Sequence, residues 1–220
     1  MRQGMRGFAL ICAGTLIVAS TLSFAEDKHP HGPMLAPIKS KPLPTKLTVD
    51  EEKKLASGES VMRQVENSDG GYGVAIQDIH APVNIVWDTI LAYDRYPDWV
   101  DNVANCTVYK KPSPGVLYVD MEISVMFVSS HLYTINTINK AEGYMSWILD
   151  RDRESSVKDT VGYWMLSPHP KEPSKTRVEY SSQMIVSGVP DFIARFLTRD
   201  SLRSGTVWVK EQAEKASSKK

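Results

Sequence analysis

His131 is the one histidine whose position suggests acid–base chemistry. It lies in the run SSHLYTINTI, whose alternation of polar and apolar residues predicts a β-strand. Asp120 and Glu122 lie in the preceding strand-like run, where either carboxylate could orient the imidazole across the sheet. His131 would then act as an acid or base in a pocket. The alternative is a structural histidine on the solvated face, which is the commoner situation for this residue type.

Other chemical motifs are missing from the sequence. His29, His31, His80 and His169 form no metal-binding spacing with one another, with cysteine or with paired carboxylates. No GxSxG nucleophile motif, Walker loop or dinucleotide fingerprint is present, and the glycines at 70–73 open a strand-like run instead of a phosphate-binding helix. The sequence therefore predicts no bound metal and no cofactor.

A cluster of aromatic and acidic side chains fills residues 86–103, VWDTILAYDRYPDWVDNV. Apolar residues recur there at helical spacing after Pro82, a residue typical of a helix start. Asp94 is typical of a helix cap, and Pro97 suits the first turn of a second short helix that directs Trp99 toward the core. We therefore interpret the acids as capping and solvated groups and the aromatics as core residues, with no catalytic role.

Alternating runs separated by turn residues fill most of residues 59–186 and predict an antiparallel sheet with one solvated face. Thr48 predicts the cap of a short preceding helix, and 111–115 predict a turn. The charged run 150–154 is expected to form a solvated rim. Two runs alternate most regularly and are expected to face inward: Leu117, Val119, Met121, Ile123 and Val125, and Val178, Tyr180, Ser182, Met184 and Val186.

The last segment, from Pro190 to about residue 216, predicts one long helix. Gly205 lies inside it, and a helical glycine costs about 1 kcal/mol relative to alanine. We expect a compensating feature, and open space above the sheet is one candidate. The apolar residues that predict the buried stripe of this helix are Phe192, Ile193, Phe196, Leu197, Val207 and Trp208.

The first 25 residues have the pattern of a secretory signal peptide. Two arginines precede an apolar run from 8 to 22, and Ser23-Phe24-Ala25 places small residues at the two positions that a signal peptidase reads. We expect cleavage after Ala25 and a periplasmic or secreted protein; the alternative is a retained membrane anchor. Residues 26–46 are rich in proline and lysine and predict an extended linker.

Residues 47–220 are expected to form one domain. The chain has 220 residues, 42% of them hydrophobic, which allows a large core. Its 26 basic and 26 acidic residues give a net charge of zero, and this balance argues against a nucleic-acid partner, because phosphate binding needs a basic face. Cys106 would be the only cysteine left after cleavage, so no internal disulfide is expected. We expect a monomer.

The order of these elements resembles the START-like (SRPBCC) superfamily, in particular its polyketide cyclase/dehydrase and coenzyme Q-binding branch. The resemblance covers about residues 71–215. It implies an α+β helix-grip fold: a curved antiparallel sheet wraps the long C-terminal helix, two short helices follow the first hairpin, and an apolar cavity lies between sheet and helix. The matching residues are Ala81-Pro82, Val86-Trp87, Tyr93-Asp94, Tyr96-Pro97 and Trp99.

The resemblance also implies a hydrophobic ligand in this cavity: a lipid, quinone, sterol or polyketide-like molecule. Several inward candidates are methionines, whose flexible side chains suit an irregular pocket. The alternative for each candidate is a place in a close-packed core. We expect the ligand to contact Met121, Ile123, Met145, Trp147, Trp164, Tyr180, Met184, Phe196 and Ser204.

Three functions compete on this basis. The leading hypothesis is a non-catalytic binding or carrier protein, with transient membrane contact as part of its work. The second is a cyclase, dehydratase or aromatase that uses the same pocket. The third is an interaction module with a filled core and no ligand.

Overall fold

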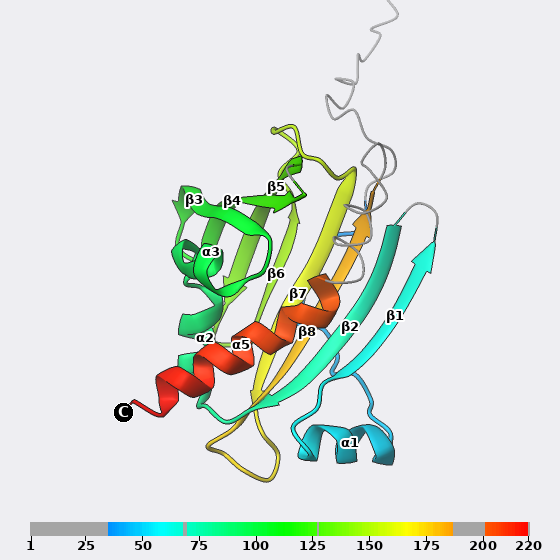
Figure 1. The fold of residues 1–220 in the computed structure, drawn as a ribbon, viewed down its shortest axis with the longest axis vertical. Coiled ribbons are helices and arrows are strands. Elements are labelled where there is room, and N and C mark those ends of the chain that lie inside the picture. The colour runs from blue at the N-terminus through cyan, green and yellow to red at the C-terminus, as the bar shows by residue number, and fades with distance from the viewer. Residues whose placement is uncertain (1–34, 68–69, 127, 187–200, 220) are drawn as a thin grey trace, which may run out of the picture.

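The computed structural model describes residues 35–67, 70–126, 128–186 and 201–219. Within these ranges, eight antiparallel strands form one curved sheet in the order β1-β2-β8-β7-β6-β5-β4-β3 (Figure 1). The strands are β1 (Val61–Asn67), β2 (Gly70–Ile79), β3 (Val103–Ser113), β4 (Val116–Val125), β5 (Val128–Asn139), β6 (Tyr144–Leu149), β7 (Asp159–Pro168) and β8 (Thr176–Ile185). The helices are α1 (Val49–Ala56), α2 (Val83–Ile90), the 3-10 turn η1 (Tyr93–Arg95), α3 (Tyr96–Trp99) and α5 (Ser201–Ser217).

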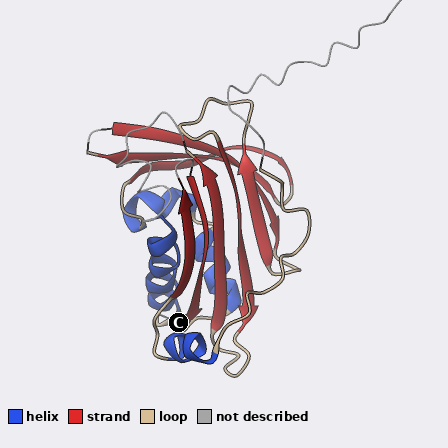
Figure 2. Ribbon diagram, turned by 90° about the vertical axis from the view of Figure 1, so that its right-hand side faces the viewer, coloured by secondary structure: helices blue, strands red, loops and turns tan. Residues whose placement is uncertain are grey.

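Helix α5 lies across one face of the sheet, against β2 and β8, and also packs on α2 (Figures 1 and 2). Trp208, Val209 and Ala213 of α5 join the main core cluster, which also contains the apolar face of α2. The expected helix-grip fold, α+β with a curved antiparallel sheet around the C-terminal helix, is confirmed. Of the predicted long helix, the part before Ser201, including Phe192, Ile193, Phe196 and Leu197, lies outside the described residues.

The two alternating runs face the core as predicted. On β4, Val119 and Ile123 are buried and Met121 packs against the same core. On β8, Val178 and Met184 are buried. The period of two fixes these positions because one face of the sheet is covered by helices.

Two aromatic side chains of α3 pack against α5. The Tyr96 ring contacts the Trp208 ring edge-on, with ring centroids 4.8 Å apart, and the Trp99 ring stacks on Trp208 with centroids 6.3 Å apart. The Tyr96 hydroxyl donates to the carbonyl of Ile90, 2.6 Å away. Their predicted role as core residues is confirmed.

Asp94 does not cap a helix, contrary to the prediction. The chain enters α3 through the 3-10 turn Tyr93–Arg95, so Arg95 takes the cap position, without a side-chain hydrogen bond. Asp94 is exposed within that turn. Thr48, in contrast, caps α1 as predicted and forms a capping box with Glu51.

The described part of the expected linker is extended and lies against the sheet. The backbone amide of Thr45 and its hydroxyl both donate to the carboxylate of Glu179, each at 2.9 Å. The backbone amide of Leu35 donates to Asp159. Both carboxylates are buried, so residues 35–46 contribute to the burial of polar groups on the side of the sheet opposite the cavity.

One further prediction holds in part, and another is wrong. Strand β3 continues to Ser113, and the expected turn shrinks to Pro114 and Gly115, because register shifts accommodate the proline-containing edge strand. Val207 is 41% exposed, since Leu202, Thr206 and Val209 occupy the buried face of α5.

The charged run 150–154 is more than the solvated rim that was predicted. Asp150 is buried and accepts a hydrogen bond from the Tyr109 hydroxyl. The Arg153 guanidinium lies over the Tyr109 ring, 4.3 Å from its centroid. The Arg151 guanidinium pairs with buried Asp159 at 2.6 Å. Asp150 and Arg153 thus contact Tyr109, which is more than 40 positions away in the sequence, and Arg151 contacts Asp159, eight positions away.

Candidate ligand-binding cavity

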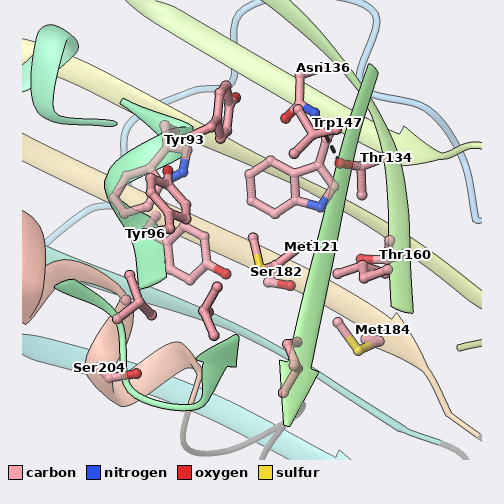
Figure 3. Close-up of a pocket in the computed structure, with 18 of the residues that line it drawn as sticks. Tyr93, Tyr96, Met121, Thr134, Asn136, Trp147, Thr160, Ser182, Met184 and Ser204 are labelled. Atoms are coloured by element: carbon pink, nitrogen blue, oxygen red, sulfur yellow. Dashed lines mark hydrogen bonds between the residues drawn. The ribbon is translucent and has the colours of Figure 1, made fainter. Parts of the chain in front are cut away.

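A cavity of about 140 Å³ lies between the sheet and the helices (Figure 3). Apolar cavities of about 150 Å³ in proteins accept a benzene ring. The described residues that line it are Tyr93, Tyr96, Val100, Val103, Val119, Met121, Ile123, Leu132, Thr134, Asn136, Met145, Trp147, Thr160, Trp164, Tyr180, Ser182, Met184, Ser204, Gly205 and Trp208.

Eight of the nine residues expected to contact a ligand lie in this lining: Met121, Ile123, Met145, Trp147, Trp164, Tyr180, Met184 and Ser204. The ninth, Phe196, lies outside the described residues. The structure therefore brings these eight side chains together around one space. Whether they bind a ligand remains a prediction.

Sequence reasoning missed the polar lining residues of β5 and the wall formed by η1 and α3. Leu132, Thr134 and Asn136 are every second residue of β5 and therefore lie on one face of the strand. The sequence alone shows this spacing. Tyr93 and Tyr96 were expected in the core, and only their long-range packing shows that they also border the cavity.

One wall of the cavity is an aromatic stack. The Tyr180 ring stacks on Trp147, with ring centroids 5.7 Å apart, and contacts Trp164 in a tilted arrangement, with centroids 4.4 Å apart. Gly162 makes room for Trp147, because a Cβ atom there would lie 2.1 Å from the indole Cζ2 atom.

Gly205 borders the cavity, as the candidate of open space above the sheet suggested, but Tyr180 occupies the place that its Cβ atom would take. A Cβ atom at Gly205 would lie 2.8 and 2.9 Å from the Cε1 and Cδ1 atoms of Tyr180. The absent side chain therefore lets α5 approach the Tyr180 ring closely. This contact offsets the helix cost of glycine and sets the position of one cavity wall.

Burial keeps the tyrosines of the cavity protonated. It raises the pKa of Tyr180 to about 12, although an interaction with Ser182 opposes the shift. Burial also raises the pKa values of Tyr93 and Tyr96 well above the ordinary range. The Tyr93 hydroxyl is buried and has no hydrogen-bond partner among the described residues.

His131 lies outside the cavity, so the hypothesis that it points into the pocket is wrong. Its neighbours on β5, Leu132 and Thr134 among them, face the cavity, and the alternation of the strand directs His131 to the other side. The His131 Nδ1 atom lies 2.9 Å from an Asp120 oxygen, and the ring stacks on Tyr133. The imidazole is 42% exposed. It thus belongs to the solvated face.

Metal ligands do not gather anywhere in the described ranges: no group of three or more His, Cys, Asp or Glu side chains could hold an ion there. Cys106 is buried, and this burial raises the pKa of its thiol to about 12. Among the helices that the structure describes, none combines the length and apolarity needed to cross a membrane.

Residues 79–205 match the family described as polyketide cyclase/dehydrase and lipid transport. This match spans more than half of the sequence, and the chain belongs to that family. No curated protein sequence matches the chain.

Solved structures share the fold at low sequence identity. A protein from Thermus thermophilus is 14% identical, with a TM-score of 0.56, over 66% of this chain and 97% of that one. A STAR-related lipid transfer protein from Xanthomonas axonopodis is 16% identical, with a TM-score of 0.54, over 70% and 92%. The ZhuI aromatase/cyclase from a Streptomyces species is 14% identical, with a TM-score of 0.50, over 72% and 94%. At such identities the likeness establishes the fold alone.

Proposed function

We propose that this protein binds and carries a hydrophobic small molecule in the cavity between its sheet and α5, without transforming it. The observation that carries the proposal is the cavity itself, bordered by Trp147, Trp164, Tyr180 and flexible methionines. Transfer of apolar ligand surface out of water would provide the binding free energy, at roughly 25 cal/mol per Å². One neighbour of the same fold is a lipid transfer protein, which agrees with this role.

The cavity volume limits the ligand. About 140 Å³ accommodates one ring or a short piece of an acyl chain. A larger lipid, quinone, sterol or polyketide-like ligand requires rearrangement of Met121, Met145 and Met184, whose unbranched side chains have several accessible rotamers.

An enzyme is the second candidate, because another neighbour is an aromatase/cyclase. Acid–base chemistry near neutral pH needs a group that titrates there. The described lining contains no Asp, Glu, His, Lys, Arg or Cys, and its tyrosines have raised pKa values. These observations favour the carrier.

The proposal includes location and assembly. A periplasmic or secreted monomer, cleaved after Ala25 and in transient contact with a membrane, would suit a carrier of hydrophobic cargo. Expression of the full chain in a bacterium, fractionation and N-terminal sequencing test this part. A mature N-terminus at Glu26 supports it, and an uncleaved chain in the membrane fraction contradicts it.

Calorimetric titration with n-butylbenzene, a neutral one-ring probe, tests the binding function. Ser182→Leu places a larger side chain in the cavity, and its control is Gln183→Leu on the exposed side of the same strand. We expect one-to-one binding by the wild type and the control, and at least tenfold weaker binding by Ser182→Leu. No binding by the wild type would favour the interaction module. Equal binding by all three proteins would place the probe elsewhere.

A further inference from the structure

Strand β5 presents polar side chains to a largely apolar cavity. Asn136 is 5% exposed and Thr134 is 8% exposed, and both belong to the lining. Burial of an amide or a hydroxyl is unfavourable unless its hydrogen-bonding groups find partners. A leucine or valine would satisfy the packing at either position, so packing alone does not explain this choice of side chains.

The described residues use only part of the hydrogen-bonding capacity of this pair. The Asn136 Nδ2 atom donates to the Thr134 hydroxyl oxygen at 2.9 Å, the contact drawn dashed beside Trp147 in Figure 3. A side-chain amide has two N–H donors, and a hydroxyl that accepts a hydrogen bond can still donate its own proton. Within the described part of the chain, Asn136 and Thr134 therefore retain one donor each beyond the bond that joins them.

A third donor comes from the helical side of the cavity. Tyr93, which also belongs to the lining, has a buried hydroxyl without a partner among the described residues. Its raised pKa keeps the proton in place. These three donors suit a ligand group that accepts hydrogen bonds, such as a carbonyl oxygen.

The lack of charged side chains in the described lining also restricts the ligand. The described lining carries no ionised side chain that would pair with a carboxylate, a phosphate or an ammonium group. A charged ligand group would lose its hydration there without compensation. The aromatic stack of Trp147, Trp164 and Tyr180 favours a flat, apolar partner.

We propose that the cavity recognises a neutral, ring-containing carbonyl compound, whose carbonyl oxygen accepts hydrogen bonds from the Asn136 amide and the Thr134 hydroxyl. This inference rests on the proposed binding function and adds the polar recognition site to it. Asn136 and Thr134 thus determine which hydrophobic molecules are retained, while the aromatic and methionine side chains provide affinity for the ring.

A pair of matched probes tests this inference on the full chain. Acetophenone carries a carbonyl group where α-methylstyrene, of almost the same shape, carries a C=CH₂ group. We expect Asn136→Leu to weaken acetophenone binding about tenfold, the equivalent of one lost hydrogen bond of about 1.4 kcal/mol, and to change α-methylstyrene binding less than twofold.

Thr134→Val provides a second variant that preserves the shape of the side chain, and it carries the test if Asn136→Leu does not fold. Its control is Thr137→Val on the same strand, because Thr137 is exposed and outside the lining. We expect Thr134→Val to weaken acetophenone binding threefold to tenfold, and Thr137→Val to change neither probe's affinity.

The outcomes separate this inference from the proposed function. Equal losses for both probes, or no loss for either, would overturn carbonyl recognition and leave hydrophobic binding intact. Wild-type protein that binds neither of these probes nor n-butylbenzene would overturn both. Selective loss of acetophenone in the two cavity variants supports the inference.

Discussion

Replacement of Gly205 by alanine tests how closely α5 and the cavity wall are packed. Alanine has the higher helix propensity, and at an ordinary helical position the change would stabilise the protein by about 1 kcal/mol. At Gly205, however, the new Cβ atom would lie 2.8 Å from the Tyr180 Cε1 atom and 2.9 Å from its Cδ1 atom. Favourable carbon–carbon contacts lie at about 3.5–4.0 Å.

The Tyr180 ring must therefore move by about 0.7 Å or more, or α5 must move away from it. The ring cannot retreat freely, because the Trp164 centroid lies only 4.4 Å away on one side. Overpacking of this kind costs about 1–3 kcal/mol. The cost of overpacking exceeds the gain in helix propensity, so we expect Gly205→Ala to lower the free energy of unfolding by about 1 kcal/mol. The displaced ring also narrows the cavity.

Urea unfolding of four proteins measures this effect: wild type, Gly205→Ala, Tyr180→Leu and the double variant. We expect the glycine substitution to destabilise the wild type but to stabilise the Tyr180→Leu background, where the ring is absent. Calorimetry should show weaker n-butylbenzene binding by Gly205→Ala than by the wild type. Equal stabilisation in both backgrounds would refute the argument that the ring contact requires glycine.

Three other predictions concern sites away from the cavity. Hydrogen bonds from Arg63 and then from the Thr48 amide lower the pKa of Glu51 from 4.5 to about 2, so the stability from its ionised form is complete above pH 4.5 and is lost as the pH falls toward 2. Glu51→Gln should therefore lower the melting temperature at pH 6, and the difference from the wild type should shrink as the pH falls to 3; a constant difference would contradict this. Glu179→Gln should cost roughly 2 kcal/mol in urea unfolding and speed proteolysis within residues 35–46, because an amide cannot accept every hydrogen bond that the buried carboxylate accepts from Thr45; unchanged proteolysis would argue against docking of this segment. His131→Ala should leave n-butylbenzene affinity within twofold in calorimetry, and a larger loss would mean that the imidazole reaches the ligand.

Local patterns predicted the parts of the fold that depend on neighbouring residues. Alternation along β4 placed Val119, Met121 and Ile123 toward the core, because a strand has only two faces. The Thr48 cap also depends on nearby residues alone. The helix-grip expectation came from the resemblance, which the family match supports.

Long-range contacts account for what the sequence did not predict. The hydrogen bonds of Thr45 to Glu179 join residues 134 positions apart, so the docking of the extended segment has no local signal. The close contact of Gly205 with Tyr180 is equally hidden from local patterns. The prediction for His131 failed for a different reason. Alternation places His131 and Leu132 on opposite faces of β5 but does not say which face is buried. The greater apolarity of Leu132 indicates that Leu132 faces inward.

A crystal structure of the protein with n-butylbenzene tests the central claim most directly. Our account predicts electron density for one molecule between the sheet and α5, in contact with Trp164 and Met184 and absent from Ser182→Leu crystals. Density only on the outer surface, or an interior filled by the protein's own side chains at saturating n-butylbenzene, would contradict it.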